Sequence, residues 1–187
     1  MMTKALAAMM AVLISLVAAA PAVAQGWDPR EEKQQKSKLV KKSNEAIEAF
    51  LEADPSLSAY FDKAYGYAVF PSVTKGGAGL GGARGKGVLY RAGAPMMKAY
   101  LSQVTVGLQL GGKKYREIVF FRDKAAYDAF VDGEFEFSAQ ATAVVASDGA
   151  GETASYDEGV AIFVLDKAGA MAEASIGGQK FKVKPLK

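Results

Sequence analysis

Seven glycines stand within only twelve residues of this 187-residue chain, at positions 76, 77, 79, 81, 82, 85 and 87. Glycine adopts φ > 0 without steric cost and lets another group approach its backbone closely, but ordering it on folding costs entropy. A short apolar run that ends at Pro71 precedes the segment, and the β-prone run 88–90 follows it. We therefore expect a strand on each side and, between them, backbone that is unusual or closely approached.

Charge is segregated along the chain. Residues 63–116 contain nine basic and no acidic residues, whereas residues 117–176 contain three basic and twelve acidic ones. If the basic segment is contiguous in space, the protein has one positive face. Alternatively, the basic and acidic segments pair across a sheet and cancel. The sequence leaves both arrangements open.

The first 24 residues have the pattern of a secretory signal peptide. A basic start, Met1–Lys4, precedes an almost wholly apolar run of 16 residues, and Ala22-Val23-Ala24 matches an A-x-A cleavage site. A transmembrane anchor is the alternative, but a bilayer needs about 20 apolar residues. We expect cleavage after Ala24 and a periplasmic or secreted protein that can attach to a membrane surface.

The absence of cysteine and histidine excludes whole classes of chemistry. Disulfides, the usual zinc sites and Ser-His-Asp or Cys-His catalysis all need one of these residues. Gly77–Gly82 matches G-x-G-x-x-G, but a strand follows where a dinucleotide site needs a helix. Glu134 and Glu136 would share a face of a strand, and nothing else marks an active site there. We expect no enzymatic activity, no cofactor and no metal.

Helical patterns occur near the N-terminus and once later. After a polar leader at 25–38, apolar residues recur at helical spacing from Leu39, and Asp54-Pro55 ends the helix. Ser56 is expected to cap a shorter helix that reaches Ala64. Asp123 is a candidate N-cap for a helix over 124–131, which Gly133 would end.

Strand patterns fill most of the remainder. Alternation predicts a strand over 104–110, a hairpin turn over 111–114 and a central strand over 115–121. Further strands are expected over 160–165 and 179–183, with a weaker pattern over 135–146. The fold class is therefore α+β: an antiparallel, barrel-like twisted sheet of six or more strands with N-terminal helices and one inserted helix, in a single domain over 39–187.

The basic residues near the glycines and on the first helix are candidate anion-binding residues, because phosphates bind cationic side chains and exposed backbone N–H groups. The helix either covers the sheet with its apolar stripe or lies on a membrane with its lysines at the headgroups. The candidates are Lys38, Lys41, Lys42, Lys75, Arg84, Lys86, Arg91, Lys113 and Lys114.

A scattered motif resembles the SYLF-domain family. It consists of Ala64-x-Gly66, Val69-Phe70-Pro71, the glycine pairs at 76–77 and 81–82, Gly87-Val88, Val106-Gly107-x-Gln109-x-Gly111-Gly112 and a closing Gly178-Gln179-Lys180-Phe181 before Pro185. The match runs from Leu39 to Pro185 and departs from the family at Ala94-Pro95-Met96, where many members have Trp-Ser-x-Pro.

The resemblance implies binding of anionic lipid without catalysis, with the helix that bears Lys38, Lys41 and Lys42 in contact with the lipid. It also implies that a set of glycines shapes the sheet: Gly66, Gly76, Gly77, Gly79, Gly81, Gly82, Gly87, Gly107 and Gly111. An anionic lipid or membrane surface is the expected partner, and nucleic acid is not. The alternative is an envelope module that docks another protein through a sheet face or edge.

Overall fold

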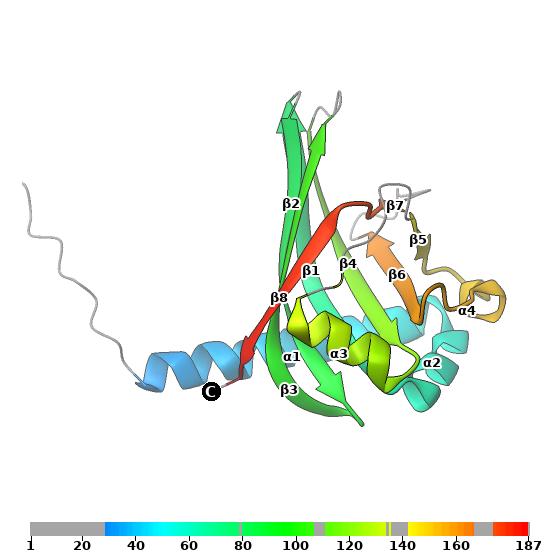
Figure 1. Cartoon of the computed structure of the whole chain (residues 1–187), viewed down its shortest axis with the longest axis horizontal. Coiled ribbons are helices and arrows are strands. Elements are labelled where there is room, and N and C mark those ends of the chain that lie inside the picture. Colours follow the sequence, from blue (N-terminus) through cyan, green and yellow to red (C-terminus); the bar gives the residue numbers. More distant parts are fainter. Residues whose placement is uncertain are drawn as a thin grey trace, which may run out of the picture.

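In the described part of the chain, eight strands form one twisted sheet in the order β7-β5-β6-β4-β1-β2-β3-β8 (Figure 1). The computed structural model describes residues 29–78, 80–106, 111–133, 135, 142–166 and 174–186. The strands are β1 (Gly66–Ala78), β2 (Leu80–Arg91), β3 (Ala94–Val106), β4 (Gly111–Phe121), β5 (Thr142–Val145), β6 (Val160–Asp166), β7 (Ala174–Ser175) and β8 (Gln179–Pro185).

The predicted α+β class and the sheet of six or more strands are confirmed, with one difference. The pair β5–β6 is parallel, so the sheet is mixed, whereas the other neighbouring strands are antiparallel. A parallel pair needs a crossover rather than a hairpin, and the chain between β5 and β6 carries a short helix. The sheet stays open, because β7 and β8 lie at its two edges.

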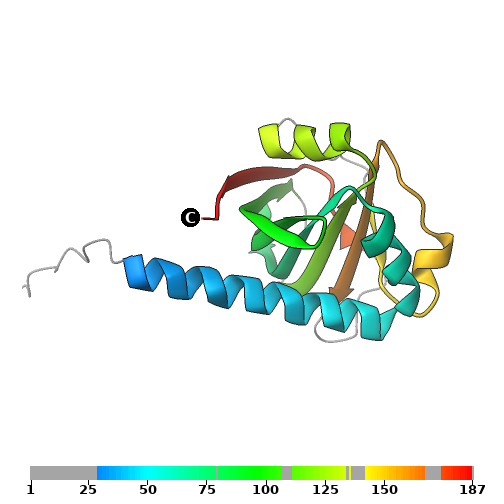
Figure 2. The same ribbon diagram turned by 90° about the horizontal axis from the view of Figure 1, so that it is seen from below.

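Helices cover both faces of the sheet. They are α1 (Pro29–Ala53), the 3-10 helix η1 (Pro55–Leu57), α2 (Ser58–Lys63), α3 (Lys124–Asp132) and α4 (Ala150–Thr153). Figure 2 shows α1 along one face and α3 across the other. We call these faces the α1 side and the α3 side. Each has its own apolar core, the α1 side around Phe50, Val88 and Phe120 and the α3 side around Phe70, Phe121 and Phe130.

Helix α1 is longer than its apolar pattern predicts. It begins at Pro29 rather than near Leu39, so residues 29–38 of the expected polar leader are helical. Proline suits the first helical position, where its missing N–H is not needed. The C-terminal half packs on the sheet, where Ala46 and Phe50 are buried. The N-terminal end projects past the sheet (Figure 2).

Asp54 is the N-cap of η1, the helical turn that follows α1. The sequence predicted Ser56 as the capping residue instead. The Oδ1 atom of Asp54 accepts hydrogen bonds from the backbone N–H and the hydroxyl of Ser56, at 3.1 and 2.6 Å. Its Oδ2 atom accepts the N–H of Gly151 at 2.7 Å, which ties α4 to this corner. Burial by itself would raise the pKa of Asp54, but these hydrogen bonds outweigh it and lower the pKa.

The later helix agrees with its prediction. The Oδ1 atom of Asp123 accepts the N–H of Ala126 at 3.0 Å, and α3 ends at Gly133, whose φ is +74°. Several strand boundaries were wrong, two of them at residues interpreted as strand ends or turns. Pro71 does not end β1, because the register of β1 shifts between Val69 and Val73 and a proline is tolerated at such an irregularity. The expected turn over 111–114 lies inside β4.

The glycine-rich segment forms regular antiparallel strands where it is described. Gly76 pairs with Gly82 and Gly77 with Gly81, so these residues belong to the β1–β2 ladder and not to an irregular loop. Gly79 and Gly107 lie outside the described residues. Close approach occurs at Gly87, where an added Cβ would lie 2.7 Å from Cδ1 of Phe70 and closer still to the carbonyl oxygen of Val69.

We predict that Gly87→Ala destabilises the protein by about 1–3 kcal/mol, the usual cost of overpacking, because the Val69 carbonyl belongs to the sheet and cannot move aside. Urea denaturation followed by circular dichroism measures the change. Gly112→Ala is the matched control, since a Cβ there meets nothing nearer than the Lys75 carbonyl oxygen at 3.9 Å. Equal stability of the two variants would contradict the prediction.

Candidate anion-binding groove

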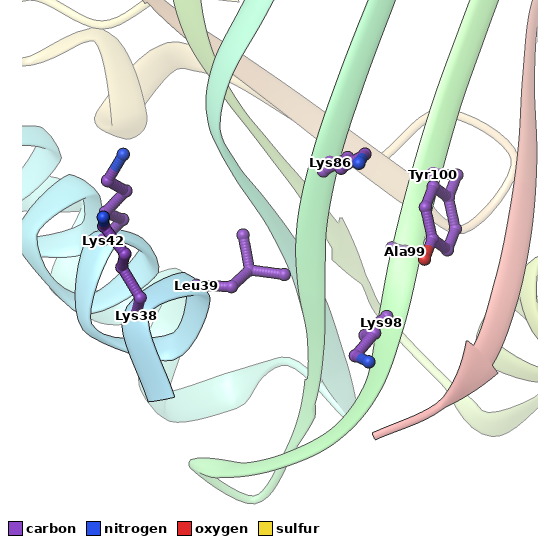
Figure 3. A pocket seen from close by; sticks show the side chains of 7 residues that line it. All are labelled: Lys38, Leu39, Lys42, Lys86, Lys98, Ala99 and Tyr100. Atoms are coloured by element: carbon purple, nitrogen blue, oxygen red, sulfur yellow. The ribbon is translucent and has the colours of Figure 1, made fainter. Parts of the chain in front are cut away.

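A basic cleft lies between α1 and the strands β2 and β3 on the α1 side of the sheet. Its volume is about 240 Å³. In Figure 3, Lys38 and Lys42 stand on the helix, Lys86 and Lys98 on the strands, and Leu39 points from the helix towards the sheet between them. Ala99 and Tyr100 complete the lining. Cations therefore stand on both walls of the cleft.

A second cleft of about 450 Å³ continues along the same strands. It shares Leu39, Lys42, Lys86 and Tyr100 with the first cleft, so the two are lobes of one depression. Its remaining lining is Pro71, Ser72, Arg84, Gly85, Leu101 and Ser102. We call the two lobes together the basic groove, lobe 1 being the one with Lys38 and Lys98 and lobe 2 the one with Arg84.

The strand register explains why the cations collect on this face. Residues directly opposite in an antiparallel sheet share a face, and alternate residues of a strand share it too. Three rows across β2, β3 and β8 thus point to the α1 side: Arg84–Ser102–Lys180, Lys86–Tyr100–Lys182 and Val88–Lys98–Lys184. None of these nine residues is acidic, and six are basic.

Apolar surface lies among these charges. Leu39 and Tyr100 are half-buried, and the ammonium nitrogen of Lys184 lies 5.7 Å from the centroid of the Tyr100 ring. Aromatic rings attract cations at such distances. A surface that mixes ammonium groups with a leucine and a tyrosine suits an anion that also has apolar parts, such as a lipid headgroup with its attached chains.

Four of the nine candidate residues line the groove, namely Lys38, Lys42, Arg84 and Lys86. The others do not line it. Lys41 is exposed and lies 4.0 Å from the carboxylate of Glu45. Arg91 stands at the far end of β2, 4.9 Å from the centroid of the Tyr65 ring.

The remaining three candidates lie on β1 and β4, close to the glycines at the paired ends of these strands. Lys75 is opposite Lys113 across β1 and β4, and both point to the α3 side. Lys114 is opposite Thr74 and points to the α1 side, in the same row as Arg84. Of the two arrangements that the sequence left open, the structure thus brings together only part of the basic segment on the α1 side.

Sequence reasoning missed Lys98 and Tyr100, although both line the groove. The cause is the start of β3, which was expected near Val104 but lies at Ala94. The alternation of Lys98, Tyr100 and Ser102 on one face was the available signal. The same period of two places Lys180, Lys182 and Lys184 on one face of β8. Glu134 and Glu136, the carboxylate pair, lie outside the described residues.

A second polar cluster lies inside the core of the α3 side. Glu117 of β4 is fully buried, and its Oε2 atom accepts a hydrogen bond from Nε2 of Gln179 at 3.1 Å, while its Oε1 has no hydrogen-bond partner among the described residues. Burial raises the pKa of Glu117 to about 8, against smaller opposing effects of Gln179 and Lys75. The Glu117 carboxyl is therefore mostly protonated at pH 7, and the contact ties β8 to the central strand β4.

Taken together, the structure is an α+β protein with a mixed sheet and a basic groove under an N-terminal helix. No family model matches the chain. It is 31% identical over 163 residues to a protein named Beta cell expansion factor A from Aeromonas veronii, and the alignment covers 82% of this chain and 59% of that protein. The chain thus spans less than two thirds of the length of this relative.

Among the described helices, none is both long enough and apolar enough to cross a bilayer.

Glu117 makes the stability of the protein depend on pH. An unfolded glutamate titrates near its ordinary pKa of 4.5, whereas the folded one titrates near 8. Between these values the folded state holds a proton that the unfolded state has lost, so stability falls as pH rises, by up to about 1.4 kcal/mol per pH unit.

We predict that Glu117→Gln flattens this fall between pH 4.5 and 8, because an amide cannot ionise. Thermal unfolding at a series of pH values measures it, and Glu152→Gln, at an exposed position of α4, is the control. An unchanged pH profile in Glu117→Gln would show that Glu117 is ionised in the folded protein.

Proposed function

We propose that this protein is a SYLF-like domain that binds anionic lipid at a membrane surface and has no enzymatic activity. The observation that carries the proposal is the basic groove, whose cations come from two separate walls, α1 and the sheet. Cations on two opposite walls can bind one anion from both sides, which cations on a single face cannot do.

The chemistry of the groove supports binding rather than reaction. Ammonium and guanidinium groups bind phosphate by charge-assisted hydrogen bonds, and each basic residue near an anionic membrane contributes about 1 kcal/mol. Leu39 and Tyr100 offer apolar contact beside the charges. Among the described residues that line the groove, none is an acidic residue that could act as a general base beside these cations.

The resemblance to the SYLF family supports the same proposal. The motif's glycines at 76–77 and 81–82 pair with each other across β1 and β2. Gly87, which has no side chain, leaves room for the Val69 carbonyl oxygen. These residues build the sheet on which Arg84 and Lys86 stand. We further propose that the protein is exported after removal of residues 1–24 and meets its lipid on an envelope membrane.

We predict that Lys42→Glu and Lys86→Glu each weaken binding to anionic vesicles at least about fivefold, since loss of one basic residue at a membrane surface costs about 1 kcal/mol. The double variant is expected to lose more. Co-sedimentation of residues 25–187 with phosphatidylcholine vesicles, with and without phosphatidylglycerol, measures the affinity. Neutral vesicles should not pellet the protein.

Lys63→Glu is the matched control, because Lys63 is exposed at the end of α2 and does not line the groove. The same charge change there should leave binding within about twofold, since screening at physiological salt weakens exposed charges beyond about 8 Å. Equal pelleting with neutral and anionic vesicles, or none with either, would reject the proposal. If a stoichiometric protein partner were then recovered from envelope extract, the protein-docking alternative would replace it.

A further inference from the structure

We propose that the basic groove recognises a glycolipid whose headgroup carries two phosphates at opposite ends of a disaccharide, the chemistry of lipid A. This inference rests on the proposed function and names the class of lipid. It derives from the division of the groove into two lobes, each with its own cationic group and with a lysine pair shared between them.

The shared residues mark the centre of the groove. Lys42 stands on α1 and Lys86 on β2, and both line lobe 1 and lobe 2. Lobe 1 adds Lys38 and Lys98 on one side of this pair. Lobe 2 adds Arg84 on the other side, with the hydroxyl-bearing side chains of Ser72 and Ser102. A single phosphate can occupy only one lobe, so the groove has room for a second.

The spacing of the lobes follows from the strand register. The lobe 1 row contains Lys98 and the lobe 2 row contains Ser102, opposite Arg84. These positions lie four residues apart on β3, which is about 13 Å along a strand. Two phosphates on neighbouring carbons of one ring would be too close together to reach both rows. A disaccharide between the phosphates has about the required length.

The centre of the groove suits sugar rings better than a third phosphate. Tyr100 stands in the middle row, opposite Lys86, and offers the apolar body and polar tip of its phenol side by side. Leu39 faces it from α1 (Figure 3). Acyl chains leaving the sugar would meet this apolar surface. At the lobe 2 end, Arg84 can bind phosphate through two parallel N–H groups.

The test is a titration of residues 25–187 with phosphatidylcholine vesicles that contain diphosphoryl lipid A, monophosphoryl lipid A or cardiolipin, compared at equal total lipid charge. We expect at least about fivefold tighter binding to the diphosphoryl form than to either of the others, since engaging one more basic residue is worth about 1 kcal/mol at an anionic surface. Cardiolipin has two phosphates, but a glycerol unit holds them close together.

Single substitutions in each lobe separate this specificity from general charge attraction. Lys38→Ala removes a cation that lines lobe 1 but not lobe 2. Arg84→Ala removes a cation that lines lobe 2 but not lobe 1. Each should abolish most of the preference for the diphosphoryl form, because each variant should lose more affinity for the diphosphoryl form than for the monophosphoryl form. Lys63→Ala should preserve the preference. The acyl-free diphosphorylated disaccharide should compete with the vesicles, whereas inorganic phosphate should not at the same concentration.

Failure of this inference and failure of the proposed function give different results. Equal affinity for the three lipids at equal charge, or a preference that survives both lobe variants, overturns the inference and leaves anionic lipid binding intact. Failure of the free headgroup to compete also overturns it, because the groove would then respond only to the bilayer. Absence of binding to all three vesicles overturns the proposed function as well.

Discussion

The packing of α1 across the sheet is the interaction on which the rest of the α1 side depends. Ala46 and Phe50 bury their side chains against Val88 and Phe120, and the hydroxyl of Tyr90 donates to Oδ1 of Asn44 at 2.9 Å. These contacts fix the height of the helix above β2 and β3. Because the N-terminal part of α1 runs on beyond this contact, its lysines stand opposite the lysines of the strands, and a groove exists between them.

The two faces of the sheet differ in what covers them. The α1 side combines an apolar contact at one end with a charged, open groove at the other, so the groove and the apolar contact use separate stretches of the same helix. The α3 side is closed over an apolar core that contains the buried carboxyl of Glu117, which accepts a hydrogen bond from Gln179. That bond spans the inside of the curved sheet from a central strand to the edge strand β8. The ladder between β3 and β8 holds the lysines of β8 in register on the other face.

Local patterns predicted the elements well where one signal dominated. Asp123 and Gly133 bounded α3 as expected, since a cap and a left-handed C-terminal residue act over a few residues only. Pro71 was misleading because a register shift in the ladder, set by neighbouring strands, accommodates it. Gly111 and Gly112 were interpreted as a turn, yet their partners across the sheet are Gly77 and Gly76. Strand ends depend on such partners, which lie far away in the sequence.

The sequence by itself determined the absence of imidazole and thiol chemistry, the α+β class and the concentration of positive charge in one third of the chain. Only the tertiary structure decided which of those charged residues line the same groove. Lys38 and Lys86 are 48 positions apart and line the same lobe of the groove, whereas Lys41 and Lys42 are adjacent and only Lys42 lines the groove. Successive side chains point about 100° apart around a helix and to alternate faces of a strand. Position along the chain therefore does not determine the direction of a side chain in space. The direction is set by the buried side chains that orient each element.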